Sequence, residues 1–270
     1  MPEGPEIKII TNWLNRVTSG SLIQDCPDTY KKFIGYKAII GYKIVKVTCK
    51  GKQIFFHLNN GVNNFYLNSR LATDGKWSKE KGNYPRFWMK LLTIGEGTVD
   101  LFFNDNLNNG GLDLFNEVSF QAKLKKLGPD LLSEDVSYDD YKRVISNNRI
   151  KTNYVCNFLV KQQYFSGIGN YLRAEVLYAC KIKPDRMLSE LTEQDKVNLY
   201  NKSIELIKSS YSFKGLTIKT YWAPDGTKGV FPCKVYGKNT DELGNNVVKN
   251  KYGKGQGADQ YVHWVPQVQI

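Results

Sequence analysis

The spacing of apolar positions near the start of the chain predicts an amphipathic helix over residues 5–18. Its apolar residues recur every three or four positions, which places them on one face of a helix. They are Ile7, Ile10, Leu14 and Val17, with Trp13 beside them. Polar residues fill the intervening positions, so the pattern indicates a helix with a single apolar face.

The segments that follow have the composition of short β-strands. Runs of β-branched and aromatic residues are interrupted by Gly51 and by Asn59-Asn60-Gly61, which favour turns. The runs cover residues 36–40, 54–58, 65–67, 86–92 and 98–103. We therefore expect antiparallel hairpins that assemble into a small β-sandwich preceded by the helix.

After Leu127-Gly128-Pro129-Asp130, a natural break, the pattern becomes helical. Ser137 and Thr192 each have an aspartate three residues later, the spacing of a capping box before a helix. The expected helices cover residues 138–146, 154–161, 171–180 and 193–209. The second half of the chain is therefore expected to be a helical domain.

The last segment is rich in glycine and asparagine and contains two strand-like runs, at residues 246–248 and 261–265. These runs predict a β-hairpin. The fold class is then α+β, and 270 residues suit two modest domains. The expected divisions are a β-sandwich domain at 1–127, a linker at 128–136, a helical domain at 137–228 and the hairpin at 229–270.

The charge balance favours a polyanionic partner. The chain has 38 Lys and Arg against 26 Asp and Glu, a formal charge of +12, and nucleic acid is the leading candidate. No apolar run approaches the roughly eighteen residues that a membrane span needs, and no secretory signal opens the chain. We expect a protein that acts inside a cell, without a membrane partner.

The cysteine and histidine content argues against a metal. The five cysteines stand singly, so neither a disulfide framework nor a four-cysteine zinc site fits. His57 and His263 are the two imidazoles, and a metal site would depend on carboxylates. We expect no metal and no cofactor.

The first six residues place a secondary amine beside two carboxylates. Removal of Met1 would expose the ring nitrogen of Pro2, a candidate nucleophile that forms an iminium with an aldehyde-level carbon. Glu3 and Glu6 could then handle protons. The structural alternative is an ordinary helix start, where proline and acidic residues are both favoured.

A second candidate site lies at residues 165–175, where Gly167 and Gly169 precede Asn170 at the expected start of a helix. Backbone amides there, with the Asn170 side chain, could cradle a phosphate, and Lys161 lies across the turn. The structural alternative is an ordinary turn between helices.

Four motifs in this order resemble the formamidopyrimidine-DNA glycosylase and endonuclease VIII family. They are Met1-Pro2-Glu3-Gly4-Pro5-Glu6, Gly51-Lys52, Leu127-Gly128-Pro129-Asp130 and Gly167-Ile168-Gly169-Asn170-Tyr171-Leu172-Arg173-Ala174-Glu175. The last is most similar to the eukaryotic endonuclease VIII-like branch. The resemblance continues through Gly215-Leu216-Thr217, Pro224-Asp225-Gly226, Gly229-Val230-Phe231 and Val235-Tyr236-Gly237-Lys238, so it covers essentially the whole chain.

The resemblance implies a bifunctional DNA glycosylase and AP lyase of base excision repair. Pro2 would attack C1′ of a nucleotide with an oxidised base, a pyrimidine by preference. Glu3 would transfer a proton at the sugar and Glu6 would support the sugar. A Schiff base would then undergo β- and δ-elimination, and Lys52 would neutralise charge at the flipped nucleotide's phosphate. The alternative for Lys52 is a solvated turn lysine.

The resemblance also implies how double-stranded DNA with oxidised bases or abasic sites would be held by a monomer. Asn170 would bind a phosphate in a helix-two-turn-helix (H2TH) motif, and lysines such as Lys161 would add salt-sensitive affinity. Leu71 stands where the family has a methionine that fills the gap left by the flipped base. The family's other two gap-filling residues, an arginine and a phenylalanine, are missing from residues 105–110.

The end of the chain departs from the family pattern. The usual zinc finger has four cysteines, but Cys233 is the only cysteine after Cys180, which indicates a zincless finger packed by Tyr252, Tyr261 and Trp264. The family's finger arginine aligns near Gln260. The candidate replacements for it are Lys249, Lys251 and Lys254.

Two other classes of function remain open at this stage. A non-catalytic module that binds damaged or abasic DNA would explain the charge and the helical motif, but it would not need Pro2 and Glu3. An RNA-binding protein of translational type would explain the charge alone. DNA as the partner places the protein in a nucleus or at a viral replication site.

Overall fold

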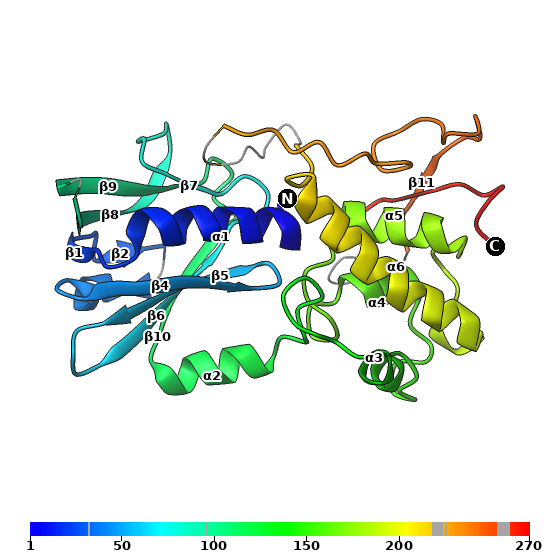
Figure 1. The fold of residues 1–270 in the computed structure, drawn as a ribbon, viewed down its shortest axis with the longest axis horizontal. Helices are drawn as coiled ribbons and strands as arrows, with labels where there is room; N and C mark the ends of the chain where they lie inside the picture. Colours follow the sequence, from blue (N-terminus) through cyan, green and yellow to red (C-terminus); the bar gives the residue numbers. More distant parts are fainter. Residues whose placement is uncertain (32, 96, 218–223, 225, 253–259) are drawn as a thin grey trace. The chain divides into compact units, whose positions relative to one another are not determined.

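The computed structural model describes residues 1–31, 33–95, 97–217, 224, 226–252 and 260–270 (Figure 1). The chain divides into two compact units. The first unit contains Met1–Pro2, Glu6–Lys126 and Leu216–Gly229, and the second contains Glu3–Pro5, Leu127–Gly215 and Val230–Ile270. A large antiparallel sheet and a set of helices confirm the expected α+β class.

Helix α1 (Gly4–Thr18) confirms the first helix predicted from the sequence, and most of it belongs to the first unit. Ile7, Ile10 and Leu14 on its apolar face are buried. The Asn15 side chain on another face accepts a hydrogen bond of 2.8 Å from the amide of Val47. The helix therefore contributes both to the core and to the backbone of a strand.

The first unit is built on one eight-stranded antiparallel sheet in the order β10-β6-β5-β4-β1-β8-β9-β7. These strands are β1 (Leu22–Asp25), β4 (Lys43–Lys50), β5 (Gln53–Asn59), β6 (Asn64–Arg70), β7 (Lys76–Ser78), β8 (Pro85–Thr93), β9 (Gly97–Asn104) and β10 (Gly111–Phe115). A separate pair consists of β2 (Thr29–Tyr30) and β3 (Phe33–Ile34). The strand-like runs at 54–58, 65–67, 86–92 and 98–103 lie inside β5, β6, β8 and β9.

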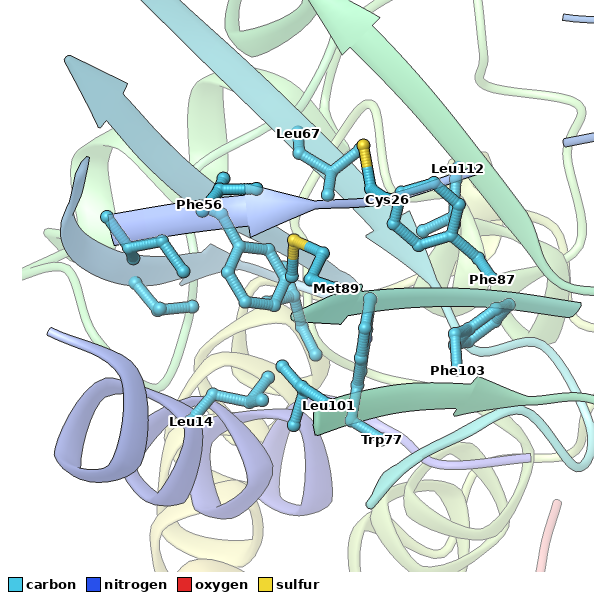
Figure 2. Close-up of a cluster of buried hydrophobic side chains, with 14 of the residues drawn as sticks. Leu14, Cys26, Phe56, Leu67, Trp77, Phe87, Met89, Leu101, Phe103 and Leu112 are labelled. Carbon is cyan, nitrogen blue, oxygen red and sulfur yellow. The ribbon is translucent and has the colours of Figure 1, made fainter. Parts of the chain in front are cut away.

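The sheet folds over so that its two halves face each other, and this makes it a sandwich. β5 and β7 are five strand spacings apart in the hydrogen-bonded order, which would be about 24 Å in a flat sheet. Yet the ring centroids of Phe56 on β5 and Trp77 on β7 are 5.1 Å apart. Figure 2 shows the resulting core, where Leu14 of α1 points into the same cluster as side chains from both halves of the sheet.

The strand expected at residues 36–40 is wrong, because Tyr36–Ile39 form a 3₁₀ helix, η1. Gly35 precedes it in the left-handed conformation at φ 108°. The three-residue repeat turns Tyr36 and Ile39 to the same side, and both are buried. The Tyr36 hydroxyl donates to the carbonyl of Leu112 at 2.8 Å, so tertiary contacts outweigh the local β preference.

Helix α2 (Glu117–Lys125) was not expected from the sequence, because it has no clear apolar stripe. Phe120 is its buried residue, and its ring stacks on Tyr66 with centroids 3.8 Å apart. The Tyr66 hydroxyl also hydrogen-bonds to Glu117. At the N-terminal end, the Asn116 side chain accepts from the amide of Ser119 at 2.9 Å. A cap and one aromatic contact thus hold a helix that periodicity does not reveal.

His57 lies under this helix, and we expect it to make the stability of the first unit dependent on pH. Burial, helped by Lys46, lowers the pKa of His57 to about 4 from 6.5. Unfolding would therefore take up a proton between those pH values, so stability should fall as the pH drops from about 6.5 to about 4. For this half-buried ring we expect a loss of about 1–2 kcal/mol.

Denaturant unfolding at pH 7 and at pH 4.5 tests this expectation by comparing the natural protein with His57→Phe. Phenylalanine retains the edge-on ring contacts with Tyr66 and Phe120 but removes the titrating group. The variant should lose less stability in acid than the natural protein does. Equal losses would contradict the assignment to His57.

The second unit is mainly helical, as expected. Its elements are α3 (Tyr138–Ile145), α4 (Val155–Val160), α5 (Asn170–Cys180), η2 (Leu188–Glu190), α6 (Glu193–Ser212), β11 (Val248–Asn250) and β12 (Val262–Trp264). Both predicted caps are present: the Ser137 hydroxyl accepts from the amide of Asp140, and the Thr192 hydroxyl from that of Asp195, each at 3.1 Å. None of the helices in the described part of the chain is long and apolar enough to cross a membrane.

The Leu127-Gly128-Pro129-Asp130 motif makes close backbone contacts with residues 162–166 within the second unit. The amide of Gly128 donates to the carbonyl of Gln162 at 2.8 Å, and that of Ser166 to the carbonyl of Pro129 at 2.8 Å. A Cβ at Gly128 would lie 2.1 Å from the carbonyl oxygen of Tyr164. The glycine is needed there because no side chain fits. The motif thus fixes the segment that precedes α5.

The hairpin expected near the C-terminal end is present. β11 pairs with β12 in antiparallel register, with Val248 opposite Trp264 and Asn250 opposite Val262. The Trp264 indole donates to the Asn250 side chain at 2.9 Å. The two strand-like runs in the sequence therefore identified this pair to within a few residues.

Candidate active site

The carboxylate of Glu3 is held by the N-terminal end of α5. It accepts hydrogen bonds from the amides of Gly169 at 2.6 Å, Tyr171 at 2.8 Å and Leu172 at 3.4 Å, and the residue is 3% exposed. A helix start with unpaired amides and a positive dipole end suits an anion. The anion that it holds is a side chain of the same chain.

This arrangement corrects the expectation of a phosphate cradle at these amides. The amides are present and converge as the glycine-rich turn indicated, but Glu3 occupies them. Asn170 lies at the same helix start. Because the amides already donate to Glu3, any phosphate that Asn170 binds would have to be bound by its side chain.

Gly4 brings Glu3 to this position through close contact with Gly167. The amide of Gly4 donates to the carbonyl of Gly167 at 2.8 Å, and a Cβ at Gly4 would lie 2.9 Å from the Cα of Gly167. Gly167 itself has φ 112°, a conformation that favours glycine. Gln162 fixes this turn, since its side-chain oxygen accepts from the amide of Gly167 and its amide donates to the carbonyl of Ile168. The sequence alone indicates no separate role for Gly4 or Gln162.

Glu6 is fixed separately, within the first unit. Its carboxylate accepts a hydrogen bond of 2.7 Å from the amide of Leu216, and the side chain is 1% exposed. Glu6 lies in the first turn of α1, where the helix dipole also favours a carboxylate. Each of the two predicted acids thus has an assigned backbone donor.

Pro2 is buried, whereas Met1 before it is 41% exposed. Because Pro2 precedes Glu3 directly, its nitrogen lies one residue away from a carboxylate whose position the helix fixes. Amine chemistry at Pro2 would depend on this adjacency of Pro2 and Glu3 along the chain.

Lys52 lies in the two-residue turn that joins β4 to β5. Lys50 and Gln53 pair across the hairpin, and Gly51 at the first central position has φ 56°. The Lys52 side chain is half-buried. The glycine therefore makes the tight turn and sets the point at which Lys52 projects.

Asn170, the first residue of α5, belongs to a polar network that the sequence did not reveal. Its side-chain oxygen accepts a hydrogen bond from Arg173, and it also hydrogen-bonds to Tyr236. Arg173 is fully buried, which lowers the pKa of its guanidinium, and one of its nitrogens lies 3.5 Å from the carbonyl oxygen of Gln260. Burial and the charge of Glu3 raise the pKa of Tyr236, and the Asn170 hydrogen bond opposes that rise.

This network bears on the missing finger arginine. At Gln260, where the family's arginine would align, the backbone faces the guanidinium of Arg173 from α5. Lys249 and Lys251 are exposed, and Lys254 lies outside the described residues, as does Asp225. Arg173 could have been suspected from the sequence, since a residue three positions after Asn170 shares its helix face.

Lys161 and Leu71 are the two other residues predicted to contact DNA, and they have different environments in the structure. Lys161 is the C-cap residue of α4, and its Nζ lies 5.9 Å from the ring centroid of Tyr164. Leu71 is 1% exposed in the core of the first unit, which contradicts the expectation that it faces DNA. Leu107, in the loop where the family's other gap-filling residues were sought, is 61% exposed.

The segment that precedes the C-terminal hairpin, residues 234–236, is attached to α5 by a buried carboxylate. Glu175 is 3% exposed and accepts from the amides of Lys234, Val235 and Tyr236 at 2.8, 3.0 and 2.8 Å. Burial raises the pKa of Glu175, and the three amides oppose the rise. Val235 and Val265 pack beside it as a small apolar core.

The aromatic packing proposed for this region is correct only in part. Trp264 is 9% exposed, and Tyr252 lies edge-on to Tyr154, but Tyr261 is 54% exposed with Lys251 above its ring. Over the described ranges, no group of three histidines, cysteines or acids is placed to hold a metal ion. Helix α5 contacts β12 of the hairpin.

Comparison with known proteins matches the two parts of the chain to one family. The model of the formamidopyrimidine-DNA glycosylase N-terminal domain matches residues 1–112, and the model of its H2TH domain matches residues 127–221. The formamidopyrimidine-DNA glycosylase of an Exiguobacterium species is 26% identical and covers 100% of this chain and 99% of the relative. Endonuclease 8 of Salmonella arizonae is 23% identical, over 80% of this chain and 82% of the relative.

Solved structures of similar proteins share the fold. MutM (Fpg) from Thermus thermophilus superposes with a TM-score of 0.85 at 24% identity, over 99% of this chain and 98% of that one. The Lactococcus lactis Fpg in complex with DNA that contains an abasic site gives 0.83 at 24% identity, over 99% of both chains. Both parts of the chain thus have counterparts of known architecture.

Proposed function

This chain belongs to the formamidopyrimidine-DNA glycosylase and endonuclease VIII family of base-excision-repair glycosylases, and on that premise we propose that it is a bifunctional DNA glycosylase and AP lyase. Its substrates would be oxidised bases, with a preference for pyrimidines, and abasic sites in double-stranded DNA. The preference for pyrimidines comes from the similarity of residues 170–175 to the endonuclease VIII-like branch.

The observation that carries the proposal is the buried Glu3 carboxylate directly after Pro2. Burying a carboxylate is costly unless hydrogen bonds compensate, and this chain devotes three helix-start amides to it. A protein that only binds DNA has no need for a charged group held in this way beside a secondary amine. A catalyst that must place a proton-transfer group beside its nucleophile does.

The reaction would start at the Pro2 nitrogen once Met1 has been removed. The nitrogen lone pair forms a bond to C1′ as the glycosidic bond breaks, and the base leaves with its bonding electrons and a proton. Glu3 transfers protons at the sugar, so that the ring opens to an iminium. The iminium acidifies the neighbouring C–H bonds, and loss of a proton with each phosphate gives β- and then δ-elimination. Hydrolysis of the iminium returns the amine.

Several groups, in each of the two units, would contribute to holding the DNA. Lys52 and Lys161 carry positive charge, and Asn170 is oriented by Arg173 at the start of α5. The charge of +12 gives the sequence-independent attraction that DNA-binding proteins share. Lactococcus lactis Fpg binds such DNA on the same fold, which supports this partner. We expect the protein to act as a monomer.

Leu107 is our candidate for the side chain that enters the DNA stack when the damaged base is flipped. Inserted apolar side chains keep a duplex open at the cost of unstacking one step. The sequence favours Leu71 for this role, but the Leu71 side chain is buried, whereas Leu107 stands exposed on the loop between β9 and β10. We therefore assign this role to Leu107.

Borohydride trapping tests the proposed chemistry, because it reduces an iminium to a stable covalent complex. The mature protein, with loss of Met1 verified by mass, should be trapped on duplexes that contain thymine glycol or an abasic site. A form with one extra residue between Met1 and Pro2 should bind the same DNA but should not be trapped, because its proline nitrogen is an amide. Pro2→Ala, which keeps a primary amine, should be trapped more weakly.

The opposite outcome is equally informative. If the mature protein binds abasic DNA tightly and no complex is trapped, the lyase proposal is wrong and the protein is a damage-binding module. Trapping of the extended form would place the nucleophile at another amine.

A further inference from the structure

The loop of residues 105–110, between β9 and β10, presents its exposed Leu107 on an unusually well bonded backbone. Surface loops normally leave much of their backbone to water and are mobile for that reason. Here both carbonyls and amides of the loop have partners in the protein. We call this segment the wedge loop.

Two cations bind carbonyl oxygens of the wedge loop. Arg86 donates from Nε to the carbonyl of Asp105 at 3.0 Å and from Nη2 to that of Asn106 at 3.5 Å. Lys31 donates from Nζ to the carbonyl of Asn108 at 3.0 Å and also to that of Gly110. The two side chains hold the loop on both sides of Leu107.

Two carboxylates bind amides of the same loop. Asp74 accepts from the amide of Leu107 at 3.0 Å. Asp105, which is fully buried, accepts from the amides of Asn109 at 3.3 Å and Gly110 at 2.8 Å. Hydrogen bonds therefore hold the backbone of Leu107 and the backbone of the residues before and after it. The Leu107 side chain itself remains exposed.

From this geometry we propose that Lys31 and Arg86 are positioning residues that hold the wedge loop ready for Leu107 to enter DNA. The inference rests on the proposed function, in which Leu107 fills the space of the flipped base. A loop that is already ordered does not lose conformational entropy when it binds, so insertion is faster and more favourable.

The chemistry of the two side chains fits this role. The planar fork of Arg86 reaches two consecutive carbonyls, which a lysine cannot match. Lys31 has a left-handed backbone at φ 56°, uncommon for a residue with a side chain, and extends to the loop from the turn after β2. Both residues are remote in sequence from the loop that they hold.

A double-mutant cycle with Lys31→Met and Leu107→Ala tests whether Lys31 acts through Leu107. The probe is a duplex with thymine glycol opposite 2-aminopurine, whose fluorescence rises when it is unstacked. Stopped-flow mixing measures insertion, and single-turnover gels measure base removal. We expect each single change to slow insertion roughly tenfold, since small displacements of a positioned group have effects of this size or larger.

The expected signature is non-additivity. If Lys31 acts by holding Leu107, the double variant should be no slower than Leu107→Ala alone. Lys37→Met is the matched control, because this exposed lysine lies nearby in sequence and has no side-chain bond to the wedge loop among the contacts described. Lys37→Met should insert Leu107 into DNA at the same rate as the natural protein.

Two results would overturn the inference. One is a double variant whose insertion rate falls by the product of the two single effects, and the other is a Lys31→Met variant that inserts as fast as the natural protein. If Lys31→Met folds poorly, as thermal unfolding would show, Arg86→Lys provides the same cycle with the charge retained. The fluorescence does not depend on strand cutting. A protein that inserts Leu107 but is never trapped by borohydride would therefore refute the proposed chemistry and leave the positioning role standing.

Discussion

Glu3→Gln should lower base excision by at least about a hundredfold and leave trapping at a preformed abasic site much less affected. In the proposed mechanism, removal of the base is the step that needs proton transfer at the sugar, and such groups contribute roughly 10²–10⁴-fold. An abasic site has already lost its base, so in that mechanism the Pro2 amine would still form the iminium. Single-turnover excision of thymine glycol and borohydride trapping of abasic DNA measure the two steps separately.

The same change should also destabilise the fold. A glutamine side chain has one acceptor oxygen and turns an NH₂ group toward amides that already donate, so part of the hydrogen bonding from Gly169, Tyr171 and Leu172 is lost. We expect the free energy of unfolding to fall by roughly 1–3 kcal/mol. Glu193→Gln, at the exposed start of α6, is the control and should leave excision unchanged. Full excision by Glu3→Gln would show that Glu3 has no catalytic role.

Glu175→Gln should loosen residues 234–236, the segment that precedes the C-terminal hairpin, from α5. The amides of Lys234, Val235 and Tyr236 all donate to this one carboxylate, and an amide side chain cannot accept all three bonds. We expect a loss of roughly 1–3 kcal/mol in the local opening free energy and weaker binding to DNA. Hydrogen exchange at residues 234–236 and DNA titration measure the two effects.

The control for this change is Glu242→Gln. Glu242 forms an exposed ion pair of 3.2 Å with Lys234, and such pairs contribute about 1 kcal/mol or less. Its exchange pattern should match the natural protein. If exchange at residues 234–236 is equally slow in Glu175→Gln, the apolar contacts of Val235 and Val265 hold the segment without the carboxylate.

The elements that local pattern determines were predictable from the sequence. Helix α1, the caps at Ser137 and Thr192 and the strand runs in β5, β6, β8 and β9 follow from spacing and turn residues, and the structure contains them. The residues of η1 favour β structure and so predict a strand, but the buried Tyr36 and Ile39 select a 3₁₀ turn. Helix α2 lacks periodicity and depends on one stacked ring.

The candidate site shows a similar division. The sequence identified Glu3 and the turn before Asn170 as separate features, and it could not show that one binds the other. That contact depends on the meeting of Gly4 and Gly167, which are far apart along the chain. Leu71 and Leu107 have the same side chain, so only tertiary burial distinguishes a core residue from an exposed one.

The binding of residues 234–236 by the Glu175 carboxylate has a further consequence for how this protein withstands oxidising conditions. Zinc fingers rely on thiolates, which peroxides oxidise, and oxidised thiolates release their metal. Here a carboxylate holds the segment that precedes the hairpin, and Val235 and Val265 pack together in a small apolar core; neither type of side chain reacts with peroxide.

Three of the cysteines are also poorly reactive: Cys26 and Cys156, which are buried, and Cys180, which is half-buried. Burial raises the pKa of the Cys26 thiol to about 11 and those of Cys156 and Cys180 to about 12, so little reactive thiolate forms at neutral pH. Oxidative stress produces the damaged bases that this family removes. A segment held by a carboxylate and by hydrocarbon contacts has no thiolate for this oxidation to remove, so we expect it to stay attached to α5 under oxidative stress.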